Sequence, residues 1–192
     1  MSKPESVSES MELDTLLRST LTSQYHAALA MLRDAIELCP DSAWSSVGGG
    51  ASFWRVAYHA LYYTHLYLQA DETTFTPWER HQTGLQDLDD IPGPEHLLKI
   101  LELPHRPPQT GIPYSKKEML EYWTLCNEMV DDAIRMLDLL APETGFSWHT
   151  PSRPKMEQHL ASIRHIQHHA AQLSDRVRTA TGRRVDWVGT DR

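Results

Sequence analysis

The chain contains little cysteine, and its cysteines lack the spacing of a thiolate metal site. Only Cys39 and Cys126 occur among 192 residues, and there is no CxxC motif. Cys126 falls on an apolar helical stripe, where a thiol packs as a small hydrophobic side chain. The sequence therefore argues against thiolate zinc sites and dithiol redox pairs. Any thiol chemistry would need a thiol from outside the chain.

Basic residues are in the minority, and long uninterrupted apolar runs are missing. The 18 basic and 26 acidic residues give a net charge of −8, which argues against a nucleic-acid-binding surface. The N-terminal sequence MSKPESVSES has no apolar stretch of a signal peptide, and Arg55, His59 and His65 interrupt the longest apolar run. We therefore expect a cytoplasmic protein without a membrane partner.

Four long helical patterns account for most of the chain. Apolar residues recur at three- and four-residue steps over four segments, at about 11–38, 52–69, 115–140 and 154–181. Ser115 and Glu118 have the spacing of a capping box, and Gly182 stands where a helix C-terminus favours glycine. No strand pattern or internal repeat competes with these helices. A chain of this length can bury one sizeable core without disulfides.

The connections between the helices predict the topology. Residues 70–114 hold most of the prolines, in clusters such as IPGPE and LPHRPP, and indicate a long crossover with a short helix at 94–103. The other two connections are shorter. The predicted fold is all-α, a four-helix bundle with a long crossover between helices 2 and 3. Residues 1–10 are predicted as a disordered N-terminus, 11–181 as a single bundle domain, and 182–192 as a C-terminal tail.

Histidine is abundant, with 11 residues, and the segment RHIQHHAAQL places His165 and His169 four positions apart. Positions i and i+4 differ by about 40° around a helix and lie one turn apart, so two imidazoles can share one ion. His168 points about 60° to the other side of His165, toward more polar positions. The apolar stripe that marks the inward face consists of Ile163, Ile166, Ala170, Leu173 and Val177. His165 and His169 lie at its edge and are the preferred pair.

A metal ion in a bundle needs a further ligand from a facing helix, and His59 is the candidate. His59 lies in the apolar run SFWRVAYHALYYTHLYL, so its imidazole must find a partner. A hydrogen bond to a carbonyl or a tyrosine hydroxyl would satisfy this need without a metal. His65, about 120° away, is predicted at the rim or surface. Arg55 suits either an anion site beside His59 or a surface ion pair.

These segments resemble a known family. The ending HIQHHAAQL is similar to the HxxxHxGQL signature of the DinB/YfiT-like metalloenzymes of the DinB superfamily, although Ala171 stands where the family often has glycine. VAYHALYYTHLYL resembles the segment with the family's helix-two histidine, and helix order and crossover position agree over nearly the whole chain. The resemblance implies that His59, His165 and His169 bind a divalent ion, commonly nickel or zinc. It also implies a homodimer.

The resemblance further implies a transferase, because several relatives use bacillithiol, mycothiol or glutathione as co-substrate. Three neutral ligands leave the charge of an ion uncompensated, so the ion lowers the pKa of a bound thiol or water. We therefore expect transfer of a low-molecular-weight thiol to a small-molecule substrate. Metal-dependent hydrolysis is the alternative, although Glu128, Asp131 and Asp132 suit a solvated helix face better than a general base. A non-catalytic bundle braced by the ion is a third possibility.

Overall fold

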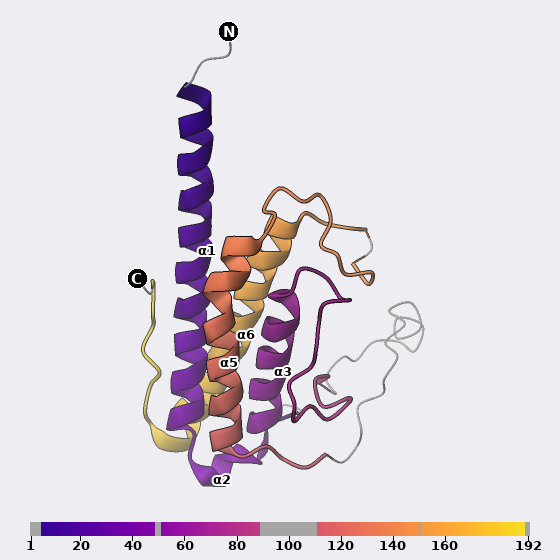
Figure 1. The fold of residues 1–192 in the computed structure, drawn as a ribbon. Helices are drawn as coiled ribbons and strands as arrows, with labels where there is room; N and C mark the ends of the chain where they lie inside the picture. The colour runs from indigo at the N-terminus through magenta and orange to yellow at the C-terminus, as the bar shows by residue number, and fades with distance from the viewer. Residues whose placement is uncertain (1–4, 49–50, 89–110, 150, 191–192) are drawn as a thin grey trace.

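The computed structural model describes residues 5–48, 51–88, 111–149 and 151–190, and this part of the chain is mostly helical (Figure 1). Its helices are α1 (Glu5–Leu38), α2 (Asp41–Trp44), α3 (Phe53–Tyr67), α5 (Lys116–Met136) and α6 (Lys155–Thr181). The short helix predicted at 94–103 lies outside the described residues. None of the described helices has the length and apolarity needed to cross a membrane.

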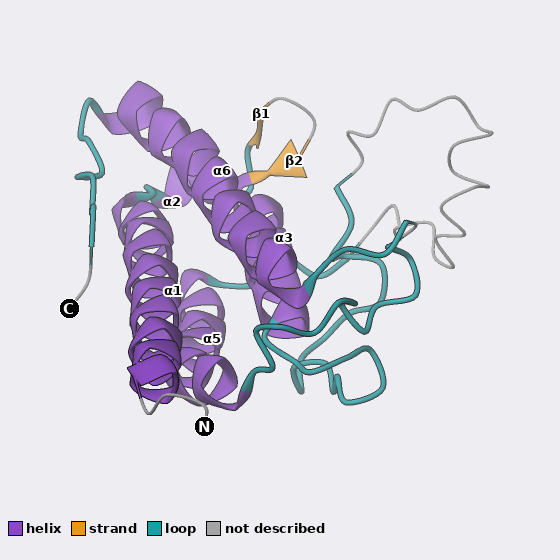
Figure 2. Ribbon diagram, turned by 90° about the horizontal axis from the view of Figure 1, so that it is seen from above, coloured by secondary structure: helices purple, strands orange, loops and turns teal. Residues whose placement is uncertain are grey.

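The four long helices pack around one hydrophobic core. Both α1 and α3 pack against α5 and α6, so α1 and α3 occupy opposite corners of the arrangement (Figure 2). Each helix contributes fully buried side chains to the core, for example Leu32, Leu61, Met119 and Ile166. The prediction that the fold is mostly helical, with helices around one core, is confirmed.

A short strand pair precedes α3 and was missed by the sequence analysis. Strands β1 (Val47–Gly48) and β2 (Ala51–Ser52) pair antiparallel, with Val47 opposite Ser52. Two residues are too few to produce an alternating hydrophobic pattern, which is the signal by which a strand is recognised. The prediction that the chain contains no strand was wrong at this point.

Helix α1 begins earlier than predicted and is longer than its neighbours. It begins at Glu5 rather than near Met11, so residues 5–10 are helical and do not form a disordered tail. The segment ESVSES contains no glycine or proline that would end a helix. The first turns of α1 project beyond the other helices (Figure 1), and Leu13 and Leu16 are exposed there.

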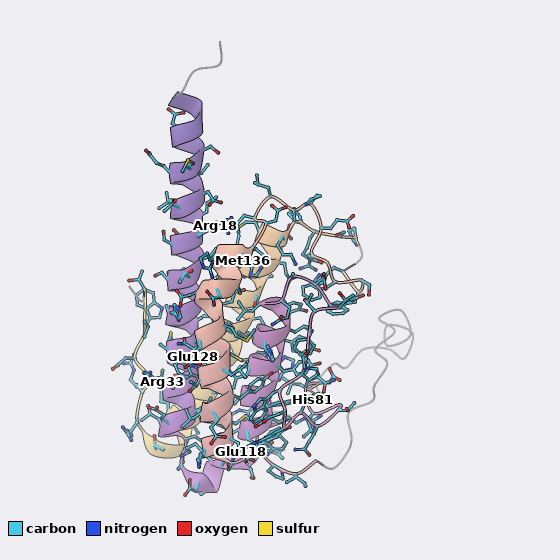
Figure 3. The ribbon with its side chains drawn as sticks, in the orientation of Figure 1. Arg18, Arg33, His81, Glu118, Glu128 and Met136 are labelled. Atoms are coloured by element: carbon cyan, nitrogen blue, oxygen red, sulfur yellow. The ribbon has the colours of Figure 1, made fainter. Side chains whose placement is uncertain are left out.

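Helix α5 ends four residues before the predicted end at Leu140, because α1 satisfies its terminal carbonyls. The Arg18 side chain lies beside the last turn of α5, near Met136 (Figure 3). Its Nη1 donates hydrogen bonds to the carbonyls of Ile134 and Leu137 at 2.6 and 2.8 Å. A guanidinium that binds the free carbonyls of a helix end stabilises that end. The end of α5 therefore depends on a tertiary contact, which the local sequence does not show.

Burial of His65 also differs from the prediction. His65 is buried between α3 and α5, with its Nδ1 3.2 Å from the Tyr122 hydroxyl, so its predicted place at the rim was wrong. The crossover covers this side of α3, where Trp78 and Leu85 are buried. Burial lowers the pKa of His65 to about 4. Helix α3 is therefore enclosed on more sides than a surface helix with one polar face.

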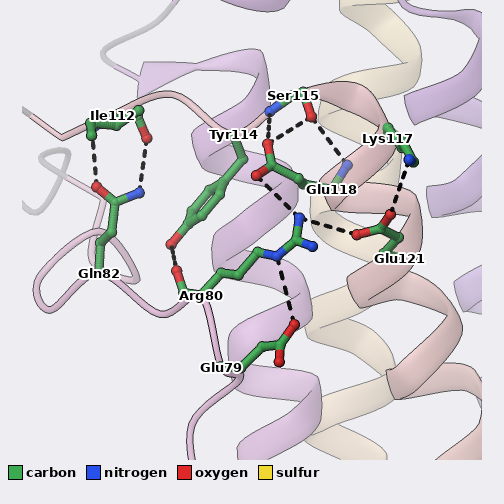
Figure 4. Close-up of polar contacts among 9 residues, drawn as sticks. All are labelled: Glu79, Arg80, Gln82, Ile112, Tyr114, Ser115, Lys117, Glu118 and Glu121. Carbon is green, nitrogen blue, oxygen red and sulfur yellow. Dashed lines mark hydrogen bonds and ion pairs between the residues drawn. The ribbon is translucent and has the colours of Figure 1, made fainter.

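The start of α5 and the end of α6 depend on local motifs, and both agree with the prediction. Ser115 and Glu118 form the capping box at the start of α5 (Figure 4). Helix α6 ends at Thr181, and Gly182 follows with a φ of 71°. The C-terminal segment then runs along α1 (Figure 1), where Val185 is buried.

Replacement of Ser115 by alanine should lower the free energy of unfolding by about 1 kcal/mol, because the hydroxyl that accepts from the Glu118 N–H is removed. Urea unfolding of the two proteins measures this difference. Lys117→Ala is the control, since Lys117 is exposed in the same turn and takes no part in the cap. Equal losses in both variants would show that the capping box contributes nothing specific.

Candidate metal centre

Three histidines from α3 and α6 converge on one point. His59, His165 and His169 each offer a ring nitrogen, and these nitrogens lie within 4.8 Å of one another. The Nε2 atom of His165 is 2.9 Å from that of His59 and 3.0 Å from that of His169. His168 is exposed. The structure thus brings together the three histidines that the sequence singles out.

The apolar stripe of α6 sets the rotation of the two histidines on that helix. Its members Ile166, Ala170, Leu173 and Val177 are all buried, and Ile163 is partly buried. His165 and His169 therefore lie at the edge of the stripe, where α6 meets α3. The His59 ring reaches them from α3, with its centroid 4.9 Å from that of His165 and 4.6 Å from that of His169.

Hydrogen bonds fix which ring nitrogens of His59 and His169 face the cluster. The Nδ1 of His59 is 2.6 Å from the backbone carbonyl of Gln86, which can only accept, so this nitrogen carries the hydrogen. The Nδ1 of His169 likewise donates to the Gln172 side-chain carbonyl at 2.8 Å. In both neutral rings the Nε2 lone pair is therefore directed to the cluster, as metal-ligating histidines require.

The centre of the three-histidine cluster has more hydrogen-bond acceptors than N–H donors. The Nε2 atoms of His59 and His169 both present lone pairs, and the ring of His165 can supply at most one N–H between them. Two imidazole nitrogens that bind one ion at 2.0–2.1 Å lie about 2.9 Å apart when they subtend a right angle. The observed separations of 2.9 and 3.0 Å match this right angle and are shorter than the roughly 3.3 Å that a tetrahedral angle gives. The donor set suits zinc, nickel, copper and iron alike.

All three rings are neutral at neutral pH. Burial, together with the neighbouring histidines, lowers the pKa of His165 to about 3, and burial lowers that of His169 to about 4. Burial also holds the pKa of His59 well below its usual value, with His169 and His165 as secondary causes. Neutral imidazole is the form that binds metal, so no proton has to leave before an ion binds.

The crossover forms part of this site. Arg55 is buried rather than exposed at the surface, and it donates from Nε and Nη2 to the Asp87 carbonyl at 3.2 and 2.7 Å. The Tyr63 hydroxyl donates to the Asp87 carboxylate at 3.1 Å, and the Tyr63 ring packs on His59. These contacts hold the segment that presents the Gln86 carbonyl to His59. Gln86 and Asp87 were not predicted from the sequence, because they lie in a loop without periodicity.

The acidic residues of α5 lie on its exposed face, as expected. Glu128, Asp131 and Asp132 are exposed, and Glu128 is visible on the outer side of α5 (Figure 3). Asp131 lies 3.3 Å from the ring of His26 on α1, away from α3. These carboxylates are therefore not the general base of a histidine site between α3 and α6.

Comparison with known proteins adds no relative: no protein family, curated protein or solved structure gives a significant match to the chain.

The face assignment predicts different effects for two neighbouring histidines. His169→Ala should abolish stoichiometric binding of zinc or nickel, because a converging nitrogen is lost, whereas His168→Ala should keep it. Elemental analysis of purified protein without an affinity tag measures the metal content. Loss of metal in the His168 variant and retention in the His169 variant would reverse the assignment.

The stability of the metal-free protein should fall as the pH drops below 6.5. Burial lowers the pKa of His65 and His159 to about 4, and it also lowers the pKa values of the three cluster histidines. The unfolded chain therefore binds more protons than the folded chain between about pH 6.5 and pH 4. Each such histidine should remove about 1 kcal/mol between pH 6.5 and 5.5.

Urea unfolding with a chelator present, at several pH values, tests this dependence. His159→Gln should show a shallower loss than the wild type, because one buried imidazole is removed. A free energy of unfolding that stays constant from pH 6.5 to 5 would contradict the argument.

Proposed function

We propose that the chain is a metalloprotein of the DinB/YfiT-like type, in which His59, His165 and His169 hold one divalent ion, nickel or zinc. The observation that carries the proposal is the convergence of three Nε2 atoms, two of them in rings whose tautomer is fixed by a hydrogen bond that Nδ1 donates. The proposed architecture is a four-helix bundle with a crossover between α3 and α5. The packing of α1 and α3 against both α5 and α6 supports it.

The proposed activity is transfer of a low-molecular-weight thiol to a small-molecule electrophile. A bound divalent ion with three neutral ligands would act as a Lewis acid that lowers the pKa of a coordinated thiol. In this reaction the thiol sulfur forms a bond to the electrophilic carbon, the leaving group departs with its electron pair, and the thiol proton passes to solvent.

The protein's own thiols cannot replace the external one. Cys126 is fully buried and Cys39 nearly so. Burial raises the pKa of Cys39 to about 11 and that of Cys126 above its usual range. Neither cysteine is therefore a thiolate nucleophile at neutral pH. This environment supports the need for a co-substrate such as bacillithiol, mycothiol or glutathione.

An open coordination position distinguishes an enzyme from a protein that the ion only braces. Within the described residues, no fourth histidine, cysteine, aspartate or glutamate joins the three-histidine group. A structural site would close its tetrahedron with a fourth protein ligand. The three-residue group therefore supports a catalytic centre over a non-catalytic one.

Metal-dependent hydrolysis is the second candidate, and Asp87 is the observation that favours it. Its carboxylate accepts from Tyr63, whose ring packs on His59 and on His165. A carboxylate one side chain away from the histidines is a candidate general base for a bound water. The thiol reaction needs no such base once the ion has lowered the pKa of the thiol.

We further propose that the protein is a cytoplasmic homodimer. The exposed apolar side chains Met11, Leu13 and Leu16 on the projecting part of α1 support an association surface. The net charge of −8 supports a small-molecule substrate over a nucleic acid.

Metal-loaded protein should accelerate the reaction of monobromobimane with an added thiol, tested separately with glutathione, bacillithiol and mycothiol. His59→Ala should abolish the acceleration, because one of three ligands is removed. The double variant Cys39→Ala, Cys126→Ala should keep it, because the thiol comes from outside. Product fluorescence above the uncatalysed rate is the measurement.

Two outcomes would redirect the assignment. Cleavage of ester or amide substrates without thiol transfer would favour the hydrolase, and Asp87→Asn should then remove that activity. Inactivity in both assays, with a fourth protein ligand on the ion, would favour the non-catalytic bundle.

A further inference from the structure

A side-chain amide on α6 connects the cluster to an exposed histidine. The Gln172 carbonyl oxygen accepts from the Nδ1 of His169 at 2.8 Å, and the Gln172 nitrogen lies 3.1 Å from the Nε2 of His168. Gln172 lies three positions after His169 and four positions after His168 on one helix, so its side chain meets both on the helix surface. Gln172 itself is exposed, whereas His169 is buried.

In the structure, the nitrogen of the Gln172 amide faces His168 and its oxygen faces His169. The amide nitrogen can only donate, so it must donate to the Nε2 lone pair of His168. The amide oxygen is then left for His169, and since this oxygen only accepts, the Nδ1 of His169 must carry the hydrogen. The reversed amide would direct its N–H groups at His169 and would favour the tautomer with hydrogen on Nε2.

We infer that Gln172 is a positioning residue that keeps His169 in the tautomer whose Nε2 lone pair faces His59 and His165, with His168 orienting the Gln172 amide. The inference rests on the proposed metal function, because the selected tautomer is the one that can bind an ion. Partners of this kind orient a ligand ring and raise its basicity. Gln172 thus acts through His169 and does not contact the ion.

His59 provides an internal comparison. Its tautomer is fixed by the backbone carbonyl of Gln86, which no side-chain substitution removes. Of the two tautomers fixed through Nδ1, only that of His169 depends on a replaceable side chain. A change at Gln172 should therefore alter one ligand of three, and it should weaken metal binding without abolishing it.

The test uses two substitutions at Gln172 and one matched control. Gln172→Leu removes both hydrogen bonds, whereas Gln172→Glu keeps an acceptor opposite the Nδ1 of His169. Gln167→Leu is the control, because Gln167 is on the same helix and its amide contacts Met31 rather than the cluster. Affinity for Zn²⁺ and Ni²⁺ is measured by competition with a chromophoric chelator at pH 7.5.

Gln172→Leu should weaken binding of both ions about tenfold, at the lower end of the effect of such partners. Gln172→Glu should bind at least as tightly as the wild type, and Gln167→Leu should not differ from it. Because Gln172 is exposed, thermal unfolding of the metal-free variants should stay close to that of the wild type. A Gln172→Leu affinity equal to that of the wild type would overturn the inference.

A second readout does not require metal. Two-bond ¹⁵N–¹H spectra of the histidine-labelled, metal-free protein should show His169 with hydrogen on Nδ1 in the wild type and in Gln172→Glu. Gln172→Leu should show a mixture of tautomers. Hydrogen on Nε2 in the wild type would overturn the inference.

Failure of the proposed metal binding would give a different set of results from failure of the inference on Gln172. If the wild type bound neither ion, the metal proposal would fail, yet the tautomer measurement would still decide whether Gln172 positions His169.

Discussion

The packing of α3 against α6, with the crossover closed over α3, is the contact on which the site depends. It takes three imidazoles out of water, and this desolvation is the first cause of their lowered pKa values. The rings are therefore neutral, with lone pairs available. If the two helices separated, His59 would lose the two histidines from the other helix, and a pair four residues apart would remain. Such a pair alone is a common and nonspecific arrangement on helices.

The histidines of the site have two kinds of hydrogen-bond partner. One depends on tertiary packing, and the other depends only on the helix itself. His59 is oriented by a backbone carbonyl of the crossover, and His169 by a side chain one turn away on its own helix. The first partner exists only when the crossover is docked, through Arg55 and Tyr63. The second exists wherever α6 is helical. The crossover is therefore part of the functional architecture as well as a connection between helices.

The features that depend on a local sequence pattern could be predicted from the sequence. The capping box of α5, the end of α6 at Gly182 and the edge position of His165 and His169 all follow from spacing within one helix. The structural features that were not predicted depend on contacts between segments that are distant in the sequence. Arg18 of α1 sets the end of α5, the crossover buries His65, and Gln86 reaches His59 from a loop. No periodicity within a short window contains that information. His59 was found because a histidine in an apolar run requires a partner.

The distance in sequence between the two contacting histidines has a consequence for the unfolded chain. His59 and His165 are 106 positions apart, so a bridge between them closes a loop of more than half the chain. In the chain-entropy treatment, a covalent link around a loop of about 100 residues stabilises a protein by about 4.7 kcal/mol. An ion that bridges the two histidines would confine the chain in the same sense, but reversibly. The time that the chain spends folded would then vary with the supply of metal in its surroundings.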